Sequence, residues 1–170
     1  ERLSSILRSL NVCIKLLFLI FLLERKNKFI KKLPNSTTFK LLVVISLMLT
    51  IVQICMGTQV RQFVDVQIHY WGLESPTKWL AEAPFLFYFH RSFSLIVLLV
   101  HLAIAFILFK YRFIPKVFLG IILFIGLEIL TGIWMYYFDF PYSSQPIHLL
   151  LASLLFGAQT YFMIRIIKQK

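Results

Sequence analysis

The chain has 170 residues, of which 59% are apolar and 16% aromatic, and its formal net charge is +11. Together with a mean hydropathy of +0.82, this composition is typical of a multi-pass membrane protein and excludes an ordinary soluble domain. The charge does not indicate nucleic-acid binding, because the bases flank apolar stretches and form no patch on a polar domain. The chain begins at Glu1 without an initiator methionine or a signal-peptide cleavage site, so we expect it to be part of a longer protein.

The first predicted element is a helix over Leu3–Leu23. Arg8, Asn11 and Lys15 interrupt it at spacings of three and four, so they form one polar stripe on an apolar cylinder. A membrane span and an interfacial helix both fit this pattern. We interpret residues 1–24 as the last helix of a preceding half of the protein, and residues 25–38 as a basic cytoplasmic linker that ends at a helix cap on Thr37 or Thr38.

Residues 39–170 are predicted to form an all-α, four-helix transmembrane bundle, with the preceding helix as a fifth element. The apolar stretches predict helices over 39–64, 85–109, 117–137 and 147–167. The long connector 65–84 contains a predicted short helix, Ser75–Ala83, and His69, which we expect to be a solvated loop residue.

The distribution of bases predicts the topology. The 25–40 linker, the 110–116 turn and the C-terminal tail are rich in Lys and Arg, so the positive-inside rule assigns them to the cytoplasm. His90 and His148 then lie near the outer ends of their helices, one or two turns deep.

A repeat is visible within the bundle, between residues 39–110 and 114–168. Gln53 precedes Gly57 by four residues as Glu128 precedes Gly132, and a histidine, His90 or His148, opens the next apolar run in each unit. Two similar hairpins predict a pseudo-twofold axis along the membrane normal, across which the two histidines face each other.

Two imidazoles placed in this way suit the axial positions of a heme iron. Arg91 and Arg61 lie at the level where the heme propionates would need cations, and Gly57 admits a flat group. The alternative interpretations are a histidine that only packs as a hydrogen-bond donor, and a Gly57 that only allows close helix packing.

Two further polar residues lie within the spans. His101 is eleven residues below His90, and the equivalent position below His148 is Gln159, so we prefer one heme with His101 as a buried polar contact. A second heme at His101 is the alternative. Glu128 is either a proton-relay group or, as the counterpart of Gln53, one partner of an interhelical hydrogen bond, which we prefer.

The motifs Gln53…Gly57-Thr58-Gln59-Val60-Arg61, His90-Arg91, Glu128-Ile129-Leu130-Thr131-Gly132 and Pro146-Ile147-His148 together resemble the C-terminal half of bacterial heme A synthase, most closely its Bacteroidetes-like members. The resemblance covers Phe39 to Lys170. It implies an oxidoreductase of the bacterial plasma membrane that converts the methyl group of heme O to the formyl group of heme A. The family places a heme ligand in the helix corresponding to Leu3–Leu23, which here has no histidine.

The resemblance also implies that this half holds heme b, ligated by His90 and His148, and relays electrons to heme O held in the other half. The family's catalytic glutamate lies three residues before a histidine, whereas Phe87 precedes His90 here, so catalytic residues are expected elsewhere. The implied partners are the lipid bilayer, heme O and heme A, heme O synthase and cytochrome oxidase; a homo-oligomer stays open. Two alternative functions are a quinol-linked b-type cytochrome and a heme-free structural subunit of a respiratory complex.

Overall fold

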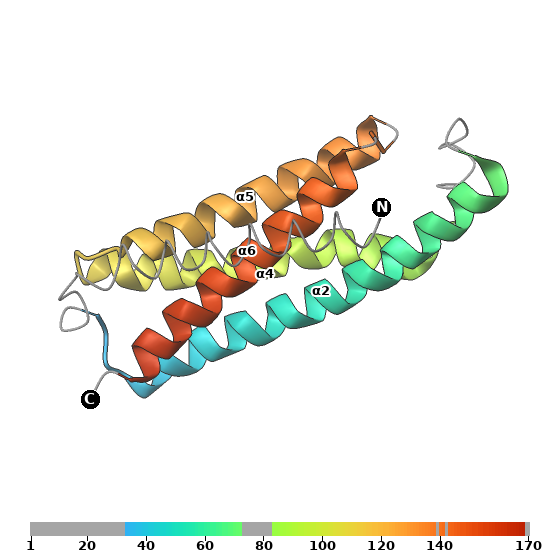
Figure 1. Ribbon diagram of the computed structural model, residues 1–170. Coiled ribbons are helices and arrows are strands. Elements are labelled where there is room, and N and C mark those ends of the chain that lie inside the picture. The colour runs from blue at the N-terminus through green and yellow to red at the C-terminus, as the bar shows by residue number, and fades with distance from the viewer. Residues whose placement is uncertain (1–32, 73–82, 139, 142, 169–170) are drawn as a thin grey trace.

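The computed structural model describes residues 33–72, 83–138, 140–141 and 143–168. These residues form four helices and no strand: α2 (Thr37–Trp71), α4 (Phe85–Lys110), α5 (Lys116–Tyr137) and α6 (Ser144–Ile167) (Figure 1). Each is long and apolar enough to cross a bilayer, which confirms the predicted all-α, multi-pass fold. The helix predicted over Leu3–Leu23 and nearly all of the short helix predicted over Ser75–Ala83 lie outside the described residues.

Helix α2 begins one residue earlier than the predicted cap would allow. Ser36, and not Thr37 or Thr38, is the N-cap, and its hydroxyl accepts a hydrogen bond from the backbone N–H of Phe39 at 3.2 Å. A serine in extended conformation at this position satisfies one of the N–H groups that the first turn leaves without a helical partner.

Helix α2 is also longer than predicted at its other end. It was expected to stop near Val64 because the sequence becomes polar, but it continues to Trp71 and stops at Gly72, whose φ is 73°. Polarity alone does not end a helix, and no residue from 58 to 71 is a glycine or proline. The prediction of His69 as a loop residue is therefore wrong: it is exposed, as expected, but in the last turn of α2.

The other helices lie close to their predicted ranges. Helix α6 begins at Ser144, three residues before the predicted start at Ile147, with Ser143 as N-cap. Pro146 is thereby included in the first turn, where its missing N–H would have had no helical acceptor.

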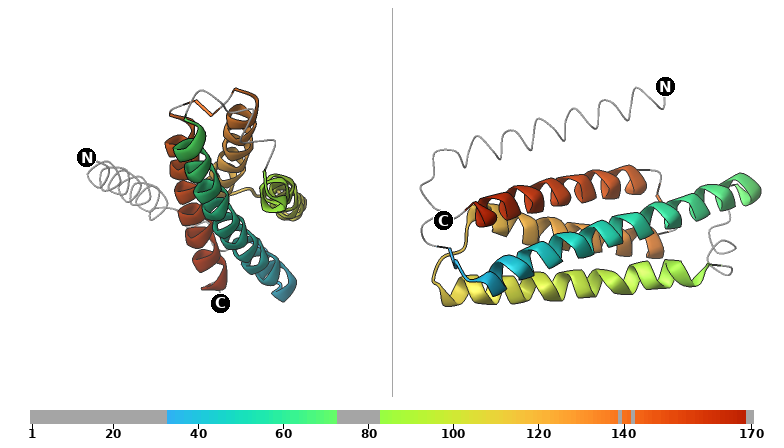
Figure 2. Two further views of the ribbon diagram at one scale, coloured as in Figure 1. Left: turned by 90° about the vertical axis from the view of Figure 1, so that its right-hand side faces the viewer. Right: turned by 90° about the horizontal axis from the view of Figure 1, so that it is seen from below.

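The four helices run alternately up and down, so that each end of the bundle collects particular segments (Figures 1 and 2). We call the end formed by the start of α2, the α4–α5 turn and the end of α6 the basic end. The opposite end, which contains His90 and His148, is called the histidine end. The most extensive helix contacts are those of α5 with α6 and of α2 with α4, and α2 also packs on α6. Each predicted hairpin is therefore a pair of packed helices, and α4 and α6 are diagonal in the bundle.

The continuous core lies in the half of the bundle nearest the basic end. It is formed by the segment just before α2, the start of α2, the first half of α5 and the second halves of α4 and α6. It consists of Leu33, Phe39, Val43, Ile104, Leu108, Val117, Phe118, Ile121, Ile125, Leu155, Ala158, Phe162 and Ile166. The rings of Phe118 and Phe162 lie 5.4 Å apart across α5 and α6. Lipid is as apolar as these side chains, so their contribution is close van der Waals packing rather than removal of apolar surface from water.

The outer surface of the bundle is strongly apolar. Leu41, Ile45, Met48 and Val52 are exposed along one face of α2, and Leu95, Leu99, Leu102 and Phe106 are exposed along α4. Apolar side chains exposed at helical spacing over this length would be unfavourable in water and are the surface that contacts lipid.

Candidate functional site

A contact between two buried polar side chains joins α4 to α6 across the diagonal of the bundle. His101 and Gln159 are both buried, and the Nε2 atoms of the two side chains lie 2.9 Å apart. The Nδ1 of His101 lies 2.7 Å from the carbonyl oxygen of Val97, which can only accept, so Nδ1 carries the proton. Nε2 then accepts a hydrogen bond from the Gln159 amide. Both nitrogens of His101 are used within the protein, which confirms its prediction as a buried polar contact.

This contact defines the relative level of α4 and α6. Both helices run from the histidine end to the basic end. His90 precedes His101 by eleven residues and His148 precedes Gln159 by eleven, which is close to three turns, or about 16 Å. Each histidine therefore lies on the same face of its helix as the residue in the contact, and the two imidazoles are at the same depth.

The imidazole of His148 is held by two residues of α5. Its Nδ1 lies 3.0 Å from Oε2 of Glu128 and 2.9 Å from Oγ1 of Thr131. The Thr131 hydroxyl proton is directed to the carbonyl oxygens of Leu127 and Glu128, at 2.9 and 3.0 Å, so the hydroxyl oxygen accepts from His148. Nδ1 is thus the protonated nitrogen, and the lone pair of Nε2 is left for another partner.

The imidazole of His90 has different neighbours. It packs on the backbone of α2 at Gly57, where an added Cβ would come within 3.1 Å of its Cε1. Gln53 donates a hydrogen bond from Nε2 to the backbone oxygen of His90 at 3.0 Å. Nδ1 of His90 and Oε1 of Gln53 are both buried, and neither has a hydrogen-bond partner.

The two hairpins therefore share the arrangement of a glycine opposite a histidine, but the contacts of the two histidines differ. Gly132 lies opposite His148 as Gly57 lies opposite His90, but an added Cβ at Gly132 would be 4.0 Å from the ring, in ordinary contact. The interhelical contact predicted for Glu128 is confirmed: the carboxylate bonds to the histidine side chain, while its counterpart Gln53 bonds to the histidine backbone.

The two arginines predicted beside the site lie at the histidine end. The guanidinium of Arg91 lies 5.0 Å from the ring centre of Tyr136 and 5.8 Å from that of Tyr88, and its side chain is exposed. Arg61 is one turn from Asp65, with Nε 3.7 Å from the carboxylate, and both side chains are about half exposed. Surface pairs of this kind are weak, so the Arg61 guanidinium is still able to bind another anion.

Two contacts of the site were not predicted from the sequence. Thr131 is three residues after Glu128 and so faces the same neighbour, a spacing that could have been noticed within the Glu-Ile-Leu-Thr-Gly motif. The contact of Tyr136 with Arg91 could not be found from sequence spacing, because the two residues lie in different hairpins.

The donor set and its surroundings fit a heme. Within the described ranges, no three His, Cys, Asp or Glu side chains gather around one point, so the pair of imidazoles is not part of a larger metal cluster. The continuous core ends before this level, and described buried apolar side chains at the histidine end are few and scattered, among them Met56, Val64 and Phe87. Each imidazole lies beside a glycine of the partner helix in its hairpin, and two imidazoles with little side-chain bulk opposite them suit a flat apolar ring with a central metal.

The comparison with known families agrees with this geometry. The COX15-CtaA family, described as cytochrome oxidase assembly protein, matches residues 9–160, which is most of the chain. No curated protein and no solved structure matches this chain. The activity of this family is that of heme A synthase, which is an oxidoreductase. This activity links the family to cytochrome oxidase assembly. Because the match covers far more than half of its length, the chain belongs to the COX15-CtaA family of cytochrome oxidase assembly proteins.

Proposed function

We propose that residues 39–170 are the heme-b half of a heme A synthase, in which His90 and His148 are the axial ligands of one heme. The observation that carries this proposal is the shared register of α4 and α6. The His101–Gln159 contact and the eleven-residue offsets bring two imidazoles to one depth on facing helices. When bound, heme would supply reversible one-electron transfer at this position.

The chain's own residues would prepare the two ligands in different ways. Glu128 and Thr131 accept from Nδ1–H of His148, which orients its ring and directs Nε2 into the bundle. His90 is positioned by the close approach of Gly57 and by the Gln53 hydrogen bond to its backbone. Its Nδ1 and the Oε1 of Gln53 are both buried without a partner, and a ring N–H and an amide oxygen are a possible donor and acceptor.

The propionates of the heme would extend toward the histidine end. Arg91 and Arg61 are the described cations there, and a guanidinium can hold a carboxylate through two parallel hydrogen bonds. At the other end the described bases are six: Lys40, Lys110, Arg112, Lys116, Arg165 and Lys168. We therefore infer that the basic end is cytoplasmic and the heme lies toward the outer side of the plasma membrane.

Electron relay, rather than oxidation of the heme O methyl group, is the role that we assign to this half. Phe87, which is buried and packs near Tyr88 and Tyr136, occupies the position three residues before His90. Glu128 is bonded to the ligand His148 itself and so does not face an open reaction centre. The substrate heme O would be held by the remainder of the full-length protein.

The test is to supply heme O to membranes that contain the full-length protein and to extract and identify the hemes. We expect heme A to form together with a retained heme b, and both His90→Ala and His148→Ala to lose the heme b. His69→Ala, in the exposed last turn of α2, is the matched control and should keep it. Retained heme b without heme A would mean a quinol-linked b-type cytochrome, and no heme in the wild type would mean a structural subunit.

A further inference from the structure

The turn between α4 and α5 contains a residue in a conformation that its side chain disfavours. Helix α4 ends with hydrogen bonds from the Arg112 N–H to the Phe109 oxygen (2.8 Å) and from the Phe113 N–H to the Leu108 oxygen (3.2 Å). This pairing is a Schellman motif, in which the left-handed position is usually glycine. Here it is Arg112, with a φ of 54°. A side chain at such a position carries an energetic cost, so its presence suggests a role for the side chain.

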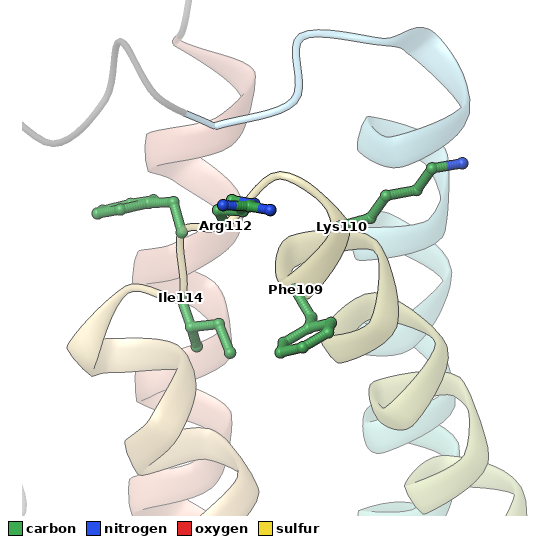
Figure 3. Close-up of a pocket in the computed structure, with 5 residues that line it drawn as sticks. Phe109, Lys110, Arg112 and Ile114 are labelled. Carbon is green, nitrogen blue, oxygen red and sulfur yellow. The ribbon is translucent and has the colours of Figure 1, made fainter.

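The same turn lines an open cavity of about 530 Å³. Its walls are the apolar side chains of Phe109, Phe113 and Ile114, and its two cationic residues are Lys110 and Arg112. Figure 3 shows Phe109 and Ile114 extending from the two sides of the turn in the same direction, toward the middle of the helices. Arg112 lies at the level of the turn above them, and Lys110 extends away from it. The cavity thus has an apolar part beside the helices and a cationic part at the turn.

The positive charge at this turn has no counter-charge among the described residues. Lys110 and Arg112 are exposed, and Lys116 follows at the start of α5. The described carboxylates, Asp65 and Glu128, belong to the half of the bundle nearer the histidine end. Glu128 is twelve residues, or about 18 Å, along α5 from Lys116.

We propose that the α4–α5 turn is a binding site for one anionic phospholipid of the surrounding leaflet. The headgroup phosphate pairs with the Arg112 guanidinium, with Lys110 and Lys116 adding to the local potential, and an acyl chain lies along Phe109, Phe113 and Ile114. A guanidinium matches the geometry of a phosphate, and basic pockets at the ends of membrane helices are where anionic headgroups are available. The lipid would support the turn that joins the two hairpins, and the site is independent of any heme.

The test measures lipid retention by the full-length protein with native mass spectrometry. Phosphatidylglycerol and phosphatidylcholine with the same acyl chains are offered to the wild type, to Arg112→Gly and to Lys168→Ala. We expect the wild type to prefer phosphatidylglycerol, and Arg112→Gly to reduce that preference roughly tenfold, because it removes one charge-assisted contact. Lys168→Ala removes a base from the same end of the bundle but outside the cavity, and should keep the preference.

Arg112→Gly is a suitable variant because glycine relieves the backbone at a φ of 54° and so should not impair folding, which circular dichroism checks. Lys110→Ala provides a second variant, with an expected smaller loss. The proposal is overturned if Arg112→Gly keeps the wild-type preference, or if phosphatidylcholine is retained equally, which would mean an apolar groove only. It is also overturned if glycerol phosphate displaces the lipid as well as phosphatidylglycerol does, which would mean a free-phosphate site.

Discussion

His148 and His90 are equivalent in the repeat, but only His148 has its Nδ1–H satisfied by side chains. Glu128 and Thr131 share that hydrogen, whereas the Nδ1 of His90 is buried without a partner. A histidine ligand whose other nitrogen donates to a carboxylate is better oriented and is a stronger electron donor to its metal. The two ligands that we propose are therefore expected to differ in strength.

Glu128→Leu tests this difference. The substitution removes the carboxylate acceptor, so we expect heme to bind about 10- to 100-fold more weakly. The midpoint potential should also shift upward, because a weaker donor stabilises ferric iron less. Glu128→Gln, whose amide oxygen can still accept, should bind heme nearly as well as the wild type. A hemin titration and a redox titration measure both quantities, and an unchanged affinity and potential in Glu128→Leu would remove this role for Glu128.

Three glycine substitutions test the close approach at His90. An added Cβ would lie 3.1 Å from the ring at Gly57, 4.0 Å from His148 at Gly132, and within 4 Å of nothing at Gly126. We expect Gly57→Ala to displace His90 and lower the ratio of heme to protein, and Gly132→Ala to have little effect. Gly126→Ala should leave heme unchanged and stabilise its helix by up to about 1 kcal/mol. Equal heme content in all three variants would contradict the assigned position of His90.

At the scale of elements, the apolar stretches predicted the helices well, whereas the polar stretch after Val64 did not indicate where α2 ends. The starts and ends of α4 and α5 agree with prediction because Pro84, Pro115 and the Lys110–Arg112 turn are strong local signals. The polar residues after Val64 are typical of a loop and predict too early an end for α2, because no residue between them and Gly72 prevents a helix. The equal offsets in the repeat indicate that Gln159 lies at the depth of His101, but they do not predict the hydrogen bond that joins the two side chains.

The His101–Gln159 hydrogen bond is expected to couple α4 to α6. Hydrogen bonds between membrane helices contribute on average about 0.6 kcal/mol and at most about 1.7 kcal/mol, so we expect a coupling energy in this range. A double-mutant cycle with His101→Leu, Gln159→Leu and the double variant, measured by reversible unfolding, gives the value. Each single variant leaves one buried polar group unpaired, so the double variant should lose less than the sum. If the double variant instead loses as much unfolding free energy as the two single variants together, the two side chains do not interact.

At the scale of the whole molecule, the core and the site occupy different halves of the bundle. The continuous core lies near the basic end, and the histidines lie beyond it. The sequence allowed the histidines to be paired through the repeat, but it did not indicate that the core would be confined to one half. That separation depends on which faces of α2 and α6 meet, and both helices are apolar around much of their circumference.

The orientation of the bundle can be tested with single cysteines. In a full-length background with Cys13 and Cys55 replaced by serine, we expect a cysteine at Tyr70 to react with an impermeant maleimide added to intact cells. A cysteine at Lys168 should react only after the membrane is opened. Tyr70 is exposed at the end of α2 and Lys168 caps α6 at the opposite end. The reverse labelling pattern would invert the topology inferred from the bases.

The most direct test of the central claim is the electron paramagnetic resonance spectrum of the oxidised full-length protein. The wild type should show a low-spin ferric signal of a heme with two imidazole ligands in the described bundle. His90→Ala and His148→Ala should each lose that signal, while His69→Ala and His101→Leu keep it. If the signal persists without His90 or His148, or disappears in His101→Leu together with a full heme equivalent, then the heme is not held between these two histidines.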